Sequence, residues 1–261
     1  MIRLGAVNYL NARPLTWALD RMPERWQIRY DFPSVCSALL AAGDVDLGLV
    51  PSIDYLNAPE YRLVPGVGIG SRGPIASVAL FTRVPIDAIR RIALDTSSRT
   101  SVALVKVLAR HRFRIEPQFV PHGPDLRAMT QTADAALLIG DPALEADPAA
   151  LGLHKIDLGS EWTAMTGLPF IYAAWTGRPG IVSAAEVRLL QEAQAEGVRA
   201  PDAIAAEYGR GDAVATARAA AYLRDNVKYG LGPDEINGLQ TFLDYAADVN
   251  AAPRKRRLEF F

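Results

Sequence analysis

The stretch "IRLGAVNYLNARPL", residues 2–15, contains the pattern that decides the fold. The apolar run up to Val7 predicts a buried β-strand. Pro14 stands where a helix begins, because proline is well tolerated in the first turn of a helix. Asn11 lies near the N-cap position of that helix, so we expect it either to cap the helix or to contact a ligand together with Asn8. A strand that leads directly into a helix indicates an α/β protein.

The alternation of strand and helix continues along the first half of the chain and then restarts. The order strand–helix–strand predicts parallel strands joined by right-handed crossovers. The segments that carry it are the predicted strands "WQIRYDF" (26–32), "VDLGLVP" (45–51), "RIALD" (91–95) and "ADAALLIG" (133–140), and the predicted helices "SVCSALLAAG" (34–43) and "RTSVALVKVLARHR" (99–112).

A Gly-rich passage without helical periodicity separates the two units, and beyond Arg178 the pattern indicates helices only. We therefore expect two lobes, with residues 1–82 and 178–261 in lobe I and residues 83–177 in lobe II. Ligands of open α/β sheets bind beyond the carboxyl ends of the strands. The loops of the two lobes should therefore face each other across a cleft.

Composition excludes several classes of function. The 261 residues carry a formal net charge of −1, which argues against nucleic acid or an anionic membrane as a partner. The single cysteine, Cys36, and three histidines without ligand spacing indicate no metal site. We see no signal peptide or membrane span and expect a cytoplasmic protein. The short basic run "PRKRR" (253–257) is typical of a solvated tail.

The strongest local signal is "LDTSSRTSVALVKVL", residues 94–108. A strand ends at Asp95, and hydroxyl residues crowd the start of a long amphipathic helix. One hydroxyl, from Ser97 or Ser98, would be enough to cap the helix. The additional polar residues favour an anion site, because a helix start offers free amide hydrogens and a positive dipole end. Candidates for this site are Ser98, Arg99, Thr100 and Ser101.

Two further loops carry candidate residues. Ser77 lies in the predicted strand of "SRGPIASVALF" (71–81), without the Gly-x-Ser-x-Gly pattern that would indicate a nucleophile. In "LLIGDPAL" (137–144) the chain turns at Gly140 and Asp141. Asp141 is either a helix cap or the carboxylate closest to the cleft.

Six segments taken together resemble the chorismate dehydratases of the futalosine route to menaquinone, and the resemblance extends from about residue 2 to the "LEFF" end. These segments are "VNYLNARPL", "GDVDLGLVPSIDYL", "GPIASVALF", "DTSSRTSVALVKVL", "ADAALLIGDPAL" and "EWTAMTGLPF". The resemblance implies a two-lobed, periplasmic-binding-protein-like type II fold with mainly parallel sheets and a ligand cleft between the lobes. It also implies a hydro-lyase that removes water from chorismate without a cofactor, giving 3-[(1-carboxyvinyl)oxy]benzoate.

Residue by residue, the resemblance places substrate contacts on Asn11, Ser77 and the helix start 98–101, with Asn8 and Gly140 nearby. Chorismate is a dianion, so a carboxylate at that helix start is physically sensible. The general base is either Asp141, His122 or the enolpyruvyl carboxylate of the substrate itself, and we favour the substrate.

Two other functions fit the same fold. One is a non-catalytic receptor for a small carboxylate, and the other is the related dihydroxynaphthoate synthase. That enzyme typically carries a Cys-Pro-Asn-Asp motif after the first strand and a catalytic histidine after a later one. Here the corresponding segments read "NYLNARP" and "IGDPAL", which favours the dehydratase. No sequence feature indicates an oligomeric state.

Overall fold

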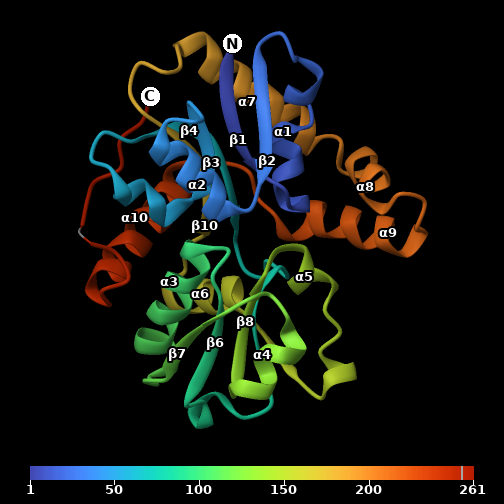
Figure 1. Ribbon diagram of the computed structural model, residues 1–261, viewed down its shortest axis with the longest axis vertical. Helices are drawn as coiled ribbons and strands as arrows, with labels where there is room; N and C mark the ends of the chain where they lie inside the picture. Colours follow the sequence, from blue (N-terminus) through green and yellow to red (C-terminus); the bar gives the residue numbers. More distant parts are fainter. Residues whose placement is uncertain (254) are drawn as a thin grey trace.

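The computed structural model describes residues 1–253 and 255–261, so Arg254 of the basic run lies outside the described residues. The chain forms two lobes, one above the other in Figure 1, and each lobe is built on a five-stranded sheet. The first and last parts of the chain form the upper lobe, and the middle part forms the lower one.

The sheet of the first lobe has the strand order β2-β1-β3-β10-β4. In its parallel part, Leu4 lies opposite Ile28 on one side and Leu47 on the other. The last strand to enter, β10, is antiparallel to both of its neighbours. The bounds are β1 (Ile2–Val7), β2 (Trp26–Asp31), β3 (Leu47–Pro51), β4 (Arg62–Ser71) and β10 (Phe170–Gly177).

The sheet of the second lobe repeats this plan with the order β7-β6-β8-β5-β9. Here β5 is antiparallel to β8 and β9. Each sheet is therefore mixed, with four strands that run in one direction and one reversed strand that comes from the chain crossing between the lobes. The bounds are β5 (Val78–Thr82), β6 (Arg91–Asp95), β7 (Gln118–His122), β8 (Ala135–Ile139) and β9 (His154–Asp157).

The crossing strands also bear on where the lobes divide. Strand β5 pairs within the second sheet, and β10 pairs within the first. We therefore propose that the chain changes lobe at residues 72–77 and 167–169, earlier than the positions near 83 and 177 that the sequence suggested. A buried apolar strand has the same sequence pattern in either sheet, so the pattern could not show to which sheet β5 and β10 belong.

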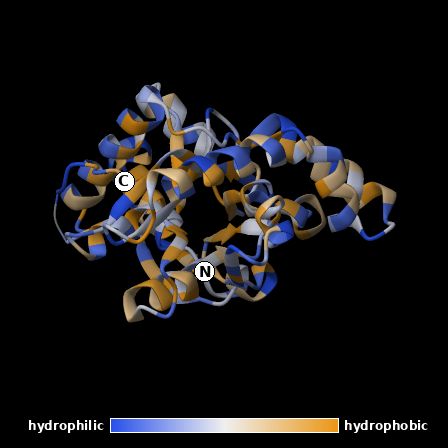
Figure 2. Ribbon diagram, turned by 90° about the horizontal axis from the view of Figure 1, so that it is seen from above, coloured by the Kyte–Doolittle hydropathy of each residue, from blue (hydrophilic) through white to orange (hydrophobic). Residues whose placement is uncertain are grey.

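Helices cover both sheets, and four of them follow β10. Helix α7 packs on α1 and β4, and α10 packs on β10, so the C-terminal helices return to the first lobe as expected. Helices α8 and α9 project from the body of the molecule, as both Figure 1 and the view from above in Figure 2 show. The helices are α1 (Arg13–Thr16), α2 (Pro33–Ala42), α3 (Arg99–Leu108), α4 (Leu126–Thr132), α5 (Gly140–Glu145), α6 (Leu158–Thr166), α7 (Ala184–Val198), α8 (Pro201–Gly209), α9 (Ala213–Ala221) and α10 (Pro233–Asp248).

Short helical turns complete the connections. They are η1 (Leu10–Ala12), η2 (Leu19–Arg21), η3 (Ser52–Asn57), η4 (Ile86–Ala88), η5 (Ala109–Phe113), η6 (Ala149–Leu151) and η7 (Tyr222–Asn226), of which η5 and η7 are π-helical. Among the residues described, no helix is both long enough and apolar enough to span a membrane.

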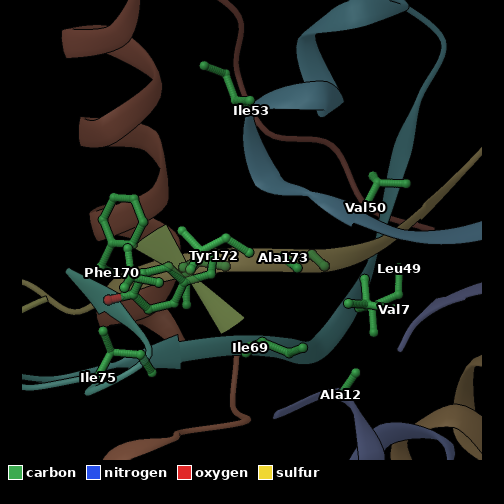
Figure 3. Close-up of a cluster of buried hydrophobic side chains, with 14 of the residues drawn as sticks. Val7, Ala12, Leu49, Val50, Ile53, Ile69, Ile75, Phe170, Tyr172 and Ala173 are labelled. Carbon is green, nitrogen blue, oxygen red and sulfur yellow. The ribbon is translucent and has the colours of Figure 1, made fainter. Parts of the chain in front are cut away.

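The main hydrophobic core runs through both lobes, because Leu4 of the first sheet and Leu104 on α3 belong to one continuous cluster. Figure 3 shows part of this cluster, with Val7, Ile69 and Tyr172 on three strands of the first sheet. A smaller cluster around Phe81 and Met129 packs α4 against the second sheet. Apolar packing across the junction holds the lobes together around the pocket that lies between them.

Candidate active site

A pocket lies between the lobes and is partly open to solvent. Its walls are mainly apolar, with a few small polar groups, which is the usual character of a small-molecule site. The first lobe contributes Val7, Tyr9, Asn11, Pro33, Pro51, Ile69, Tyr172 and Ala173, and the second contributes Val78, Ser98, Ser101, Ile139 and Gly140. Within the described part of the chain, the lining contains no lysine or arginine.

Asn11 lines this pocket from η1, directly after the first strand. It does not cap the following helix, because no side-chain capping bond is made at the start of η1 or α1. Its carbonyl oxygen Oδ1 is buried and has no hydrogen-bond partner among the described residues. An orphaned buried acceptor costs about 1–3 kcal/mol, so its persistence in a pocket indicates a ligand group. Of the two expectations for Asn11, the structure therefore favours ligand contact.

The start of α3 faces the same pocket. Ser98 is the N-cap, and its Oγ accepts a hydrogen bond of 3.4 Å from the backbone N–H of Ser101 and lies 3.1 Å from Ser101 Oγ. Both serines line the pocket, whereas Thr100 does not in the described part of the chain. The Thr100 Oγ1 accepts a hydrogen bond of 3.2 Å from the backbone N–H of Ile53. The helix start thus brings hydroxyls and a positive dipole end to the cleft.

Arg99 does not reach this pocket. Its guanidinium donates to Asp54 Oδ1 of η3 at 3.3 Å, and both residues line a separate hollow on the outer side of α3. Asp54 is nearly fully buried and also accepts hydrogen bonds from Ser37 and Asn57. The structure therefore assigns Arg99 to an ion pair between the lobes, and a direct contact with the substrate would need a different side-chain conformation.

Ser77 lies behind the pocket wall and is only 1% exposed. Its neighbour Val78 lines the pocket. The carbonyl of Ser77 accepts a hydrogen bond of 2.8 Å from the backbone N–H of Gly140, another lining residue. The Ser77 Oγ lies 2.7 Å from the hydroxyl of Tyr222. Sequence reasoning did not identify Tyr222, because it lies 145 residues away in an alanine-rich amphipathic segment where an aromatic residue reads as core.

The crossover that carries Ser77 is held in a strained conformation. Ala76 has a φ of 65°, in the left-handed region that non-glycine residues rarely adopt. The Asp157 carboxylate accepts hydrogen bonds from the backbone N–H groups of Ile75 at 3.1 Å and Ala76 at 2.6 Å. Strain of this kind clusters at functional sites, where the surrounding structure enforces it. Asp157 therefore fixes the backbone conformation of the two residues that precede Ser77.

Gly140 and Tyr9 make a close contact across the cleft. A Cβ at position 140 would lie 2.8 Å from the Tyr9 ring, and the backbone φ of 67° also requires glycine. Burial raises the pKa of Tyr9 above its usual value, so the ring carries a neutral hydroxyl at the pocket wall. The glycine predicted from the sequence therefore serves to admit an aromatic ring of the opposite lobe.

Asp141, Asn8 and His122 lie outside the lining of this pocket in the part of the chain described. Asp141 and Asn8 border a polar hollow on the far side of Tyr9, next to α8 and α9. The Asp141 carboxylate accepts a hydrogen bond of 3.1 Å from the backbone N–H of Leu10, and burial raises its pKa. His122 lies at the end of β7, where its ring Nδ1 is 2.8 Å from the carbonyl of Gly123. Asp141 thus joins the lobes rather than capping α5, whose start carries no side-chain cap.

Comparison with solved structures defines the class of fold. A protein of Archaeoglobus fulgidus superimposes with a TM-score of 0.76 at 19% identity, covering 95% of this chain and 97% of that one. The periplasmic aliphatic sulphonate binding protein of Escherichia coli gives a TM-score of 0.65 at 18% identity, covering 97% and 89%. The chain therefore has the two-lobed fold of periplasmic binding proteins, as the sequence predicted.

Sequence comparison then defines the family. The pattern of the family described as menaquinone biosynthesis matches residues 2–248. A chorismate dehydratase of Thermus thermophilus is 32% identical over 212 residues, which cover 75% of this chain and 77% of that relative. The chain belongs to the menaquinone biosynthesis family. This membership favours a biosynthetic role over that of a solute receptor.

Proposed function

We propose that this protein is a hydro-lyase that removes water from chorismate to give 3-[(1-carboxyvinyl)oxy]benzoate. The substrate is inferred from the relative at 32% identity. The geometric observation that carries the proposal is the buried, orphaned carboxamide oxygen of Asn11 in an apolar pocket opposite the start of α3. The pocket offers a hydroxylated, carboxylated ring one polar partner on each side. A cytoplasmic location is part of the same proposal.

Binding of the dianion would rely on dipoles instead of full charges, because no lysine or arginine lines the described pocket. We place the ring carboxylate at the start of α3, where Ser98 and Ser101 present hydroxyls beside the helix amides. The apolar side chains of Val7, Ile69 and Ile139 would pack against the ring. An apolar site of this kind strengthens each hydrogen bond to the substrate.

The reaction requires loss of a proton from ring C3 and of hydroxide from C4. A base takes the C3 proton, the electrons of the C3–H bond form the new ring double bond, and the C4–O bond breaks. The base then passes the proton to the departing hydroxide, which leaves as water. The Asn11 carboxamide carries both an acceptor and a donor, so it can bind the C4 hydroxyl and continue to donate as negative charge grows on that oxygen. The ring becomes aromatic, which supplies the driving force.

The base in this proposal is the enolpyruvyl carboxylate of the substrate. Two observations support it: Asp141 is engaged by the Leu10 amide in the neighbouring hollow, and His122 lies at an edge strand beside Gly123. The protein would contribute orientation, with Ser77 fixing that carboxylate within reach of the C3 proton.

The direct test is to incubate the purified protein with chorismate alone and to analyse the products by chromatography and mass spectrometry. We expect chorismate to be replaced by an aromatic product lighter by one water molecule. Unchanged chorismate, with the protein shown to be folded by circular dichroism, would contradict the proposal.

A further inference from the structure

The hydroxyls of Ser77 and Tyr222 form a hydrogen-bonded pair behind the pocket. Their oxygens are 2.7 Å apart, and the two residues are 1% and 3% exposed. Neither residue belongs to the pocket lining in the described part of the chain, but Val78, the neighbour of Ser77, does, so a link from Tyr222 to the substrate would run through Ser77. The pair joins the C-terminal helices to the crossover between β4 and β5.

The chain fixes Tyr222 firmly in this place. It begins the π-helical turn η7 at the end of α9, and such turns are frequent at functional sites. The residues that follow are attached to the same crossover. Asn226 Nδ2 donates to the carbonyl of Pro74 at 3.0 Å, and Lys228 exchanges backbone hydrogen bonds with Gly70. These bonds join the segment that follows Tyr222 to the segment that precedes Ser77, and so they fix the distance between the two residues.

The direction of the hydrogen bond between them decides what Ser77 can do. Each hydroxyl has one proton, and a carboxylate only accepts hydrogen bonds. If Ser77 donates to Tyr222, it has no proton left for a substrate carboxylate. If Tyr222 donates to Ser77, the Ser77 proton is free to point into the pocket. Burial raises the pKa of Tyr222, which keeps the phenol protonated and able to donate.

Resting on the proposed function, we propose that Tyr222 is a positioning residue for the dehydration: its hydroxyl donates to Ser77 Oγ and turns the Ser77 proton toward the enolpyruvyl carboxylate of the substrate. That carboxylate is thereby held at the C3 proton that it removes.

The protein provides a matched control in Tyr229. It is also nearly fully buried, on the same C-terminal segment, but its hydroxyl has no hydrogen-bond partner among the described residues. Tyr222→Phe and Tyr229→Phe each remove one buried phenol oxygen and leave the ring in place. A purely structural role for the Tyr222 hydroxyl predicts a loss of thermal stability in Tyr222→Phe without a change in kcat/KM.

The experiment measures steady-state turnover of chorismate and thermal unfolding for the wild type, both phenylalanine variants, Ser77→Ala and the Ser77→Ala/Tyr222→Phe double variant. We expect Tyr222→Phe to lower kcat/KM roughly ten- to a hundredfold, as for one lost hydrogen bond in a buried network, and Tyr229→Phe to stay near wild type. The double variant should be no slower than Ser77→Ala, because Tyr222 acts through Ser77.

Two results would overturn the inference while the proposed function stands. These are an active wild type with unaffected Tyr222→Phe, and losses for Ser77→Ala and Tyr222→Phe that simply multiply. An inactive, folded wild type would overturn the proposed function and this inference together. Unfolding measurements on the same samples separate a loss of structure from a loss of positioning.

Discussion

The side-chain carboxylate of Asp141 in the second lobe accepts a hydrogen bond of 3.1 Å from the backbone N–H of Leu10 in the first. This contact occupies the only protein carboxylate that the sequence suggested as a base, and Asp141 lies across Tyr9 from the pocket. We expect Asp141→Asn, which keeps an acceptor oxygen, to change kcat by no more than about threefold. Loss of a general base would lower kcat by roughly 10²–10⁴. Turnover of chorismate by the variant distinguishes the two roles, and a large kcat loss with binding intact would count against substrate assistance.

The same variant has a signature in the pH dependence of stability. Burial raises the folded-state pKa of Asp141 above its unfolded value. The folded state then holds the proton more tightly, so this group destabilises the protein progressively as pH rises through the unfolded and then the folded pKa. Asn removes that penalty. We expect the Tm of Asp141→Asn relative to wild type to be higher at pH about 7.5 than at pH about 4.5. A Tm difference independent of pH, or one that falls, would contradict the assignment.

Gly140 has a matched control in Gly152. Both adopt left-handed backbone, with φ of 67° and 64°, but a Cβ would meet the Tyr9 ring at Gly140 and nothing described within 4 Å at Gly152. An alanine at either position should cost about 1–2 kcal/mol of stability from the backbone alone. Only Gly140→Ala should displace Tyr9, and we expect it to lower kcat/KM at least about tenfold, because small misplacements in a site are costly. Thermal unfolding and turnover of both variants provide the test. Equal activities would show that the contact with Tyr9 does not shape the pocket.

The sequence proposed Arg99 for the anion site, whereas the structure pairs it with Asp54. Arg99 is paired with Asp54 across the lobes, and its side chain is 51% exposed. The ion pair should therefore contribute at most about 1 kcal/mol to the free energy of the contact between the lobes. We expect Arg99→Ala to raise KM by at most about fivefold without changing kcat. If Arg99 instead held a substrate carboxylate, the loss would reach about thirtyfold or more. Arg112→Ala, which breaks a pair with Glu161 inside the second lobe, is the control.

The sequence predicted most of the elements because their apolar periodicity is local. Three of the residues that it proposed for the site, Asn11, Ser98 and Gly140, line one pocket, because their loops follow strand ends that meet at the cleft. The sequence could not assign β5 and β10 to their sheets, because a buried strand reads alike in either one. Arg99 was placed at the anion site by its position in the sequence, but side-chain direction on the first helical turn sends it to Asp54. Tyr222 and Asp157 act on the Ser77 crossover from distant segments, and only the tertiary structure brings them there.

The central claim is that chorismate loses water in the pocket that Asn11 lines. The most direct measurement is the rate of product formation by Asn11→Ala beside Asn8→Ala, with chorismate binding determined separately by calorimetry. Asn8 is exposed and borders the neighbouring hollow, so its variant should retain near wild-type turnover. Asn11→Ala should bind chorismate but turn it over roughly 10²–10³-fold more slowly, as for loss of a donor to developing negative charge. Equal turnover by the two variants would contradict the account.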